Sequence, residues 1–150
     1  MKKFRFSLAS VLRVRQVRED ERRRVMGELS ALARAQELSI ESIAEREREE
    51  FGAIARLSSL GTIDVARIRS HAAAAASLRT KARGEAESLA GTRDRMEKER
   101  PRLVKAAAER RAIERLREAR LEEWRRDMLR EEQHDLDDRA GATRPNGDEE

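Results

Sequence analysis

The sequence predicts an all-α protein built as a long two-helix antiparallel coiled-coil hairpin, and three observations predict it. Charged residues make up 43% of the 150 residues, with only three Phe, one Trp and no Tyr, which leaves too little apolar material for a compact core. The chain has only two prolines, and Ala, Glu, Arg and Leu dominate it, a composition typical of long helices. Between two stretches of helical periodicity lies one cluster of turn-forming residues, at 58–64.

The first helix is expected over residues 7–57, where no proline interrupts the chain and Ser7 suits the N-cap position. Apolar residues recur there at intervals of three, four and seven: Leu8, Val11, Leu12, Val25, Leu29, Leu32, Ile40, Ile43, Phe51, Ile54 and Leu57. In one heptad frame Arg15, Arg18 and Arg22 take positions expected to be apolar. That part of the seam is therefore expected to be partly solvated or to meet a partner.

The turn is expected over residues 58–64, the tip of the hairpin. Gly61 suits the C-cap of the first helix, and either Thr62 or Asp64 suits the N-cap of the second. If residues equidistant from Gly61 pair, the run Ala72–Ala76 lies opposite Arg46–Glu50. The small alanine side chains would allow close approach there, although strong helix propensity alone also accounts for the run.

The second helix is expected over residues 65–138, with a kink or short break near Pro101, because an internal proline costs about 3 kcal/mol. The two helices with their turn form one domain, residues 1–140, and residues 141–150 are expected to be a disordered tail. Because the second helix is longer, its part from about residue 114 to 138 is expected to project beyond the first without an intramolecular partner. An unpaired amphipathic helix of this kind is a candidate docking element.

The ends of the chain carry opposite charges. Residues 1–24 contain nine Lys or Arg and three acids, whereas residues 131–150 contain eight acids and two arginines. The segment from Ile113 to Asp138 is striped: Glu114, Glu118 and Glu122 lie on one helix face, and Arg110, Arg117 and Arg120 lie on another. Trp124 is either an anchor for a partner or a packing residue against Phe4 or Phe6, and both alternatives stay open.

No catalytic chemistry is expected. The chain has no cysteine and no glycine-rich phosphate loop, and His71 and His134 lie too far apart to share a metal ion. A two-helix rod also offers no pocket in which one carboxyl group could be desolvated. We therefore expect no enzyme activity, cofactor or metal. The basic N-terminal residues lead into no apolar segment, so we expect a cytoplasmic chain without a signal peptide.

Nucleic-acid binding is an alternative because 29 of the 34 cationic residues are Arg. The cations alternate with acids, however, and aromatic stacking platforms are missing, so we expect no nucleic-acid partner. Salt-dependent binding to duplex DNA would identify a basic nucleic-acid-binding coiled coil. A third interpretation is a coiled coil of two chains, which light scattering would distinguish from a folded-back single chain.

Both ends of the chain resemble the FliJ family of flagellar export proteins. The matching segments are FRFSL at 4–8 with Val11, Leu12 and Arg15, the REDE cluster at 18–21, IERLREARLEEW at 113–124 and EQHDLDD at 132–138. The chain departs from the family pattern at Trp124, where Tyr or Phe is more usual, at Ala119, where a basic residue is typical, and at Pro101.

The resemblance implies a fold similar to the coiled coil of the rotary ATPase gamma subunit and a role in flagellar type III protein export. The implied protein is a central stalk and activator of the hexameric export ATPase, linking it to the cytoplasmic domain of the export gate and escorting export chaperones. It would be cytoplasmic, held at the inner face of the cell membrane at the flagellar base through its partners only. The equivalent stalk of a virulence type III secretion system is the alternative within this class.

Two sets of contact residues follow from this interpretation. The set expected to contact the ATPase ring comprises Leu8, Val11, Leu12, Leu116, Arg117, Arg120 and Trp124. The set expected to contact the export gate, on the side of the hairpin tip, comprises Ile40, Ile43, Phe51 and Ile68.

Overall fold

The computed structural model describes residues 3–59 and 63–142, and these residues form two long α-helices. Helix α1 spans Ala9–Ser59 and helix α2 spans Val65–Ala142, with 51 and 78 residues. Within the described ranges there is no β-strand. The predicted all-α fold class of two long packed helices is confirmed.

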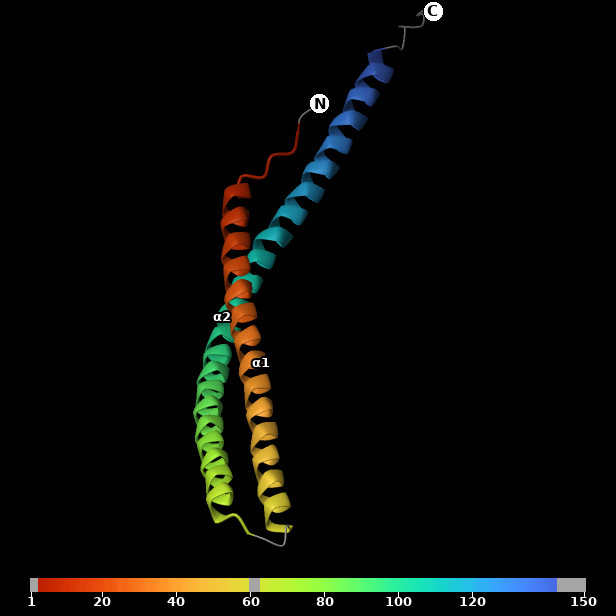
Figure 1. Ribbon diagram of the computed structural model, residues 1–150. Helices are drawn as coiled ribbons and strands as arrows, with labels where there is room; N and C mark the ends of the chain where they lie inside the picture. The colour runs from red at the N-terminus through yellow and green to blue at the C-terminus, as the bar shows by residue number, and fades with distance from the viewer. Residues whose placement is uncertain (1–2, 60–62, 143–150) are drawn as a thin grey trace, which may run out of the picture. The chain divides into compact units, whose positions relative to one another are not determined.

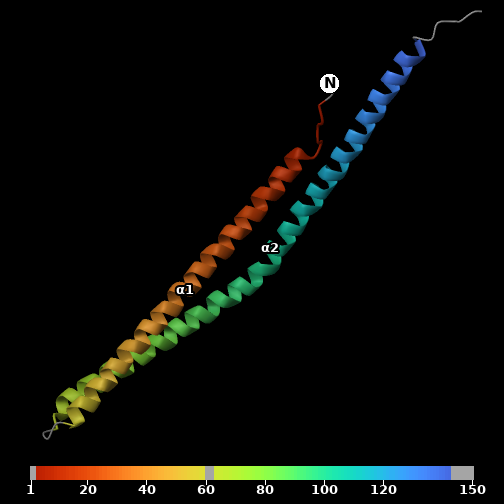
Figure 2. The same ribbon diagram turned by 90° about the vertical axis from the view of Figure 1, so that its right-hand side faces the viewer.

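The chain divides into two compact units. The described part of the first, called the terminal unit, comprises residues 3–19 and 105–142, and that of the second, called the turn unit, comprises 20–59 and 63–104. In each unit a part of α1 runs antiparallel to a part of α2 (Figures 1 and 2). Both helices therefore contribute to both units.

Helix α1 begins at Ala9, two residues later than predicted. The Phe6 carbonyl accepts a hydrogen bond from the Ala9 N–H at 3.2 Å, and the Leu8 carbonyl accepts the first regular helical bond, from the Leu12 N–H at 2.9 Å. Phe4, Phe6 and Leu8 are half-buried while Arg5 and Ser7 are exposed. Residues 7 and 8 form a turn that the Phe6–Ala9 hydrogen bond closes, and the apolar side chains around this turn are partly buried, so the helix starts after Leu8 rather than at Ser7.

The connection between the helices begins after Ser59, two residues beyond the predicted end of the first helix. Asp64 caps α2: its side-chain Oδ1 accepts the Arg67 N–H at 3.0 Å, and its carbonyl accepts the Ile68 N–H at 3.1 Å. Of the two predicted caps, the structure therefore selects Asp64. The predicted C-cap Gly61 and the other candidate, Thr62, lie outside the described residues.

Buried and half-buried residues alternate at intervals of three and four along both helices, the spacing of a coiled-coil seam. On α1 the seam residues are Leu12, Arg15 and Glu19 in the terminal unit, and Arg22, Met26, Leu29, Ala33, Gln36, Ile40, Ile43, Glu47, Glu50, Ile54 and Leu57 in the turn unit. On α2 they are Ile68, His71, Ala75, Leu78, Ala82, Glu85, Leu89, Thr92, Met96, Glu99 and Leu103 in the turn unit, and Arg110 and Ile113 in the terminal unit. In each unit the seam is thus mixed in chemistry, with apolar, polar and charged residues at the same spacing.

Helix α2 continues through Pro101, so the short break considered near this residue does not occur. Glu97 and Pro101 are both exposed, and water can therefore satisfy the carbonyl group that loses its helical donor. The kink near Pro101 stays a prediction.

The C-terminal end of α2 lies at Ala142, four residues beyond the predicted end at 138. Residues 141 and 142 are therefore helical rather than part of a tail, and the remaining predicted tail residues, 143–150, lie outside the described part. Arg139 in the last turn complements the negative end of the helix dipole and favours this longer helix. Neither described helix is long and apolar enough to cross a membrane.

Candidate partner-binding surfaces

The aromatic contact of the terminal unit joins the two ends of the chain. The rings of Phe4 and Trp124 lie 5.9 Å apart between centroids and are tilted by 54°. Trp124 is half-buried in this contact. Of the two alternatives for Trp124, the structure therefore shows packing against the N-terminal segment, with Phe4 as the partner ring.

The residues predicted to contact an ATPase ring all belong to the terminal unit but differ in exposure. Leu12 is a seam residue and is only 8% exposed. Its side chain therefore packs inside the unit and is not available on the surface for a partner. Leu8 is half-buried, whereas Val11 and Leu116 are each 37% exposed. Arg117 and Arg120 are exposed and form no ion pair within the described residues. The accessible part of this set is therefore cationic with an apolar margin.

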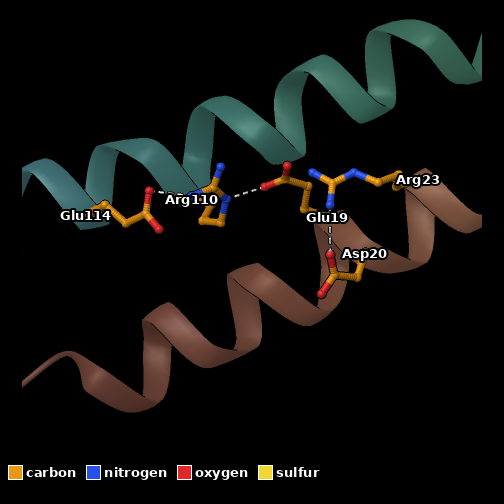
Figure 3. A network of polar contacts seen from close by, with 5 residues as sticks. All are labelled: Glu19, Asp20, Arg23, Arg110 and Glu114. Carbon is orange, nitrogen blue, oxygen red and sulfur yellow. Dashed lines mark hydrogen bonds and ion pairs between the residues drawn. The ribbon is translucent and has the colours of Figure 1, made fainter.

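A charged layer crosses the seam of the terminal unit. The Arg110 guanidinium donates hydrogen bonds to the carboxylates of Glu19 and Glu114 (Figure 3). The bond to Glu19, then that to Glu114, raises the pKa of Arg110, against the opposing effect of desolvation. Glu19 is 4% exposed, so the Arg110 hydrogen bond helps to offset the desolvation of its carboxylate. Arg15 pairs with Glu109 in the neighbouring layer.

This layer changes the predicted roles of several charged residues. Arg15 was expected to be solvated or to meet a partner, but its partner, Glu109, belongs to the same unit. Arg110 lies in the seam and not in an outer stripe with Arg117 and Arg120. Glu114 is half-buried and pairs with Arg110, whereas Glu118 and Glu122, predicted for the same stripe, are exposed. The heptad frame places Arg15 and Arg22 at seam positions, and both are half-buried there. The same spacing continued through the other charged residues also places Glu19 and Arg110 in the seam.

The turn unit has a charged layer of its own at Glu99, which is 5% exposed. The guanidinium groups of Arg22 and Arg102 donate to its two carboxylate oxygens at 2.8 Å and 3.1 Å. The hydrogen bond from Arg22 is the main cause that lowers the pKa of Glu99, and desolvation opposes it. Arg18, in contrast to Arg22, is exposed. Asp20 and Arg23 form a separate, exposed ion pair at 3.3 Å, also drawn in Figure 3.

The residues predicted to contact an export gate all lie in the turn unit. Ile40, Ile43 and Ile68 are half-buried seam residues, so they hold the helices together. Phe51 is 47% exposed, and the Arg79 guanidinium lies over its ring, with the central carbon 5.8 Å from the centroid. Only Phe51 in this set therefore presents a large side chain to solvent.

The alanine run lies where the register predicted it. A surface hollow of the turn unit is lined from both helices by Arg46, Glu49, Glu50, Ala74, Ser77, Leu78 and Lys81. Nearby, His71 Nδ1 and Glu50 Oε2 lie 2.6 Å apart. Within the described ranges no group of three His, Cys, Asp or Glu residues is arranged to hold a metal ion.

Comparison with known proteins matched one family. The family described as "Flagellar FliJ protein" matches residues 4–144, which include the N-terminal FRFSL segment, the 113–124 segment and the acidic segment 132–138. Neither the curated proteins nor the solved structures gave a match. The family match covers nearly the whole chain and therefore both units.

Proposed function

Because the chain belongs to the FliJ family of flagellar proteins, we propose that it acts as the central stalk and activator of the hexameric flagellar export ATPase. The family match supports this proposal because the family is related to flagellar protein export. In this proposal the chain also links the ATPase to the cytoplasmic domain of the export gate and escorts export chaperones. It works in the cytoplasm, held at the inner face of the membrane at the flagellar base by these partners.

One observation carries the proposal: the terminal unit combines a packed two-helix scaffold with exposed cations that form no ion pair among residues 3–59 and 63–142. Arg117 and Arg120 project from α2 beside Leu116, on a unit held by Leu12 and the Arg110 layer. Such a surface suits ring subunits that present acidic and apolar groups toward a central opening. The chain performs no chemistry in this role. It promotes ring assembly and transmits motion through rigid contacts.

The arginines support this proposal over nucleic-acid binding. Arg15 and Arg110 in the terminal unit, and Arg22, Arg79 and Arg93 in the turn unit, bind acids of the opposite helix. These guanidinium groups are engaged within the protein, so they do not form the continuous positive face that binds duplex phosphates. Electrophoretic shift with duplex DNA at near-physiological salt tests the alternative directly.

The test of the proposed function uses the full chain and a cognate export ATPase. We expect the wild type to bind the ATPase and to raise its turnover and its oligomerisation. The double variant Arg117→Glu/Arg120→Glu should bind at least about tenfold more weakly, since each lost charge contact at an interface is worth about 1 kcal/mol or more. Helicity measured by circular dichroism should be unchanged.

The matched control is Arg83→Glu/Arg95→Glu, which changes two exposed arginines of the turn unit by the same charge. It should bind like the wild type. A wild type that neither binds nor stimulates the ATPase would reject the stalk function. Unchanged binding by the Arg117/Arg120 variant would remove these two residues from the contact surface.

A further inference from the structure

The first turns of α1 present an exposed apolar and basic surface in the terminal unit. Val11, Val14 and Val17, here called the valine face, are 37%, 50% and 62% exposed. Successive members are three residues apart, so each neighbours the next on the helix surface. Residues 9–18 carry three arginines and no acid. A hollow beside the valine face is lined by Ser10, Val11, Val14, Arg15 and Arg18.

The last turns of α2 present the complementary surface. Residues 129–139, here called the acidic segment, contain five acids and two arginines, a net charge of −3. Leu129 and Leu136 are 65% and 64% exposed, and their spacing of seven places them on one helix face. The charged contacts formed locally, between Arg130 and Asp127 at 3.5 Å and between His134 and Asp138 at 3.1 Å, leave both leucines uncovered.

The two surfaces cannot meet within one chain. The pairs Arg15–Glu109 and Phe4–Trp124 fix the register of the terminal unit, so the acidic segment begins five residues past the α2 residue that contacts Phe4. From Trp124 to Leu136 the helix advances about 18 Å away from α1. In both views α2 continues past the start of α1 (Figures 1 and 2). The valine face, in contrast, belongs to the first turns of α1.

We propose that two copies of the chain form a symmetric dimer in which the acidic segment of each copy packs against the valine face of the other. The apolar side chains match in length, since Leu129 to Leu136 spans about 10 Å and Val11 to Val17 about 9 Å along their helices. The charges are opposite as well: Arg13 and Arg18 are exposed on residues 9–18, where Arg15 is already paired with Glu109, and residues 129–139 carry a net charge of −3. One two-fold axis satisfies both contacts at once.

The register also places the symmetry axis. The α2 residues beside Val14 lie near position 112, and the acidic segment is centred near position 134, so the axis passes about midway, beside residues 120–125 of α2. These parts of the two copies then run antiparallel to each other. The dimer requires no ATPase, so cross-linking and sedimentation test it apart from the proposed stalk function, although the dimer covers Val11 and Arg120 of the predicted ATPase contact set.

Cross-linking tests the contact directly because the natural chain has no cysteine. A Val14→Cys chain mixed with a Leu136→Cys chain should form a heterodisulfide under mild oxidation, as contacting helices can bring Cα atoms within about 7 Å. The control mixes Leu136→Cys with Val104→Cys, whose residue is 63% exposed and belongs to the turn unit. Equal cross-linking of both mixtures would overturn the proposal.

Sedimentation velocity of the purified full chain, without ATPase, provides the second test. We expect a monomer–dimer equilibrium below about 100 µM that weakens in high salt, because the contact is charge-assisted. Leu129→Glu/Leu136→Glu should weaken dimerisation at least tenfold. The control, Ile63→Glu/Val65→Glu, places the same charges at residues 67% and 59% exposed in the turn unit and should leave dimerisation unchanged. A monomer throughout, or a dimer indifferent to the leucine changes, would overturn the proposal.

Discussion

At the scale of single residues, the seam owes its specificity to buried charges that have more than one partner. Glu99 accepts from two arginines, and Arg110 donates to two carboxylates. Because an ion loses its hydration when buried, such a residue is stable there only with these partners in place. Removing one partner should therefore cost more stability than replacing the whole group with apolar residues.

The Glu99 carboxylate predicts how stability depends on pH. Its pKa is lowered in the folded state, mainly by the hydrogen bond from Arg22, so folding favours the ionised form. The resulting stability is present above the ordinary carboxyl pKa and is lost as pH falls through the lowered value. Thermal unfolding should therefore show Glu99→Gln less stable than the wild type at pH 7, with the difference shrinking in acid.

The control for this prediction is Glu97→Gln, since Glu97 is exposed and lies 3.7 Å from Arg100 in a surface pair. It should change the melting temperature little at either pH. A Glu99→Gln deficit that stayed constant from pH 7 into acid would contradict the ionised-state explanation.

The Arg110 layer predicts a non-additive pair of substitutions. Arg110→Met removes the Arg110 hydrogen bond from Glu19, which is only 4% exposed, so the variant should be clearly destabilised in urea unfolding. Adding Glu19→Leu removes the buried carboxylate and fills the seam with apolar volume. The double variant should therefore recover much of the stability, and additive losses in the double-mutant cycle would contradict this coupling.

At the scale of elements, the extent of both helices follows closely from the sequence, because the three-and-four spacing and the Asp64 cap are local signals. The late start of α1 does not, since it depends on Phe4, Phe6 and Leu8 turning inward together. The heptad frame places Arg15 in the seam but does not supply its partner Glu109, and it leaves out Glu19 and Arg110, because these residues are stable in the seam only when cross-helix partners balance their desolvation. The proposed contact role of exposed residues such as Arg117 depends on the partner, which the sequence of one chain does not contain.

The small seam residues of the turn unit predict that a larger side chain at their positions lowers the stability of the protein. Ala75 is 2% exposed in the seam, so Ala75→Leu should overpack it and destabilise the protein by about 1–3 kcal/mol. Ala76→Leu is the matched control. Ala76 is the next residue on the same helix and is exposed, and leucine has a helix propensity similar to that of alanine. Chemical unfolding measures both. Equal stability of the two variants would show that the seam at Ala75 has room to expand.

At the scale of the whole molecule, both proposed interactions, with the ATPase and with a second copy, use exposed surfaces and no enclosed site. The proposed ATPase contact uses exposed cations of the terminal unit, and the proposed dimer uses its valine face and acidic segment. Both sets lie outside the buried seam, so variants in them are expected to alter association while the helices persist. The separate readouts, ATPase turnover and sedimentation, distinguish failure of one proposal from failure of the other.

The small number of buried apolar side chains in the seam affects how stability depends on temperature. Among the described residues the buried apolar side chains are Leu12, Ala33, Ala75 and Leu89, so unfolding exposes little new apolar surface for each residue. The heat capacity change of unfolding scales with that surface and should fall below the usual 12–15 cal/mol/K per residue. Calorimetry should then find a shallow stability curve, whereas a heat capacity change typical of globular domains would contradict this expectation. Cooling would loosen such a protein far less than one held by a large apolar core.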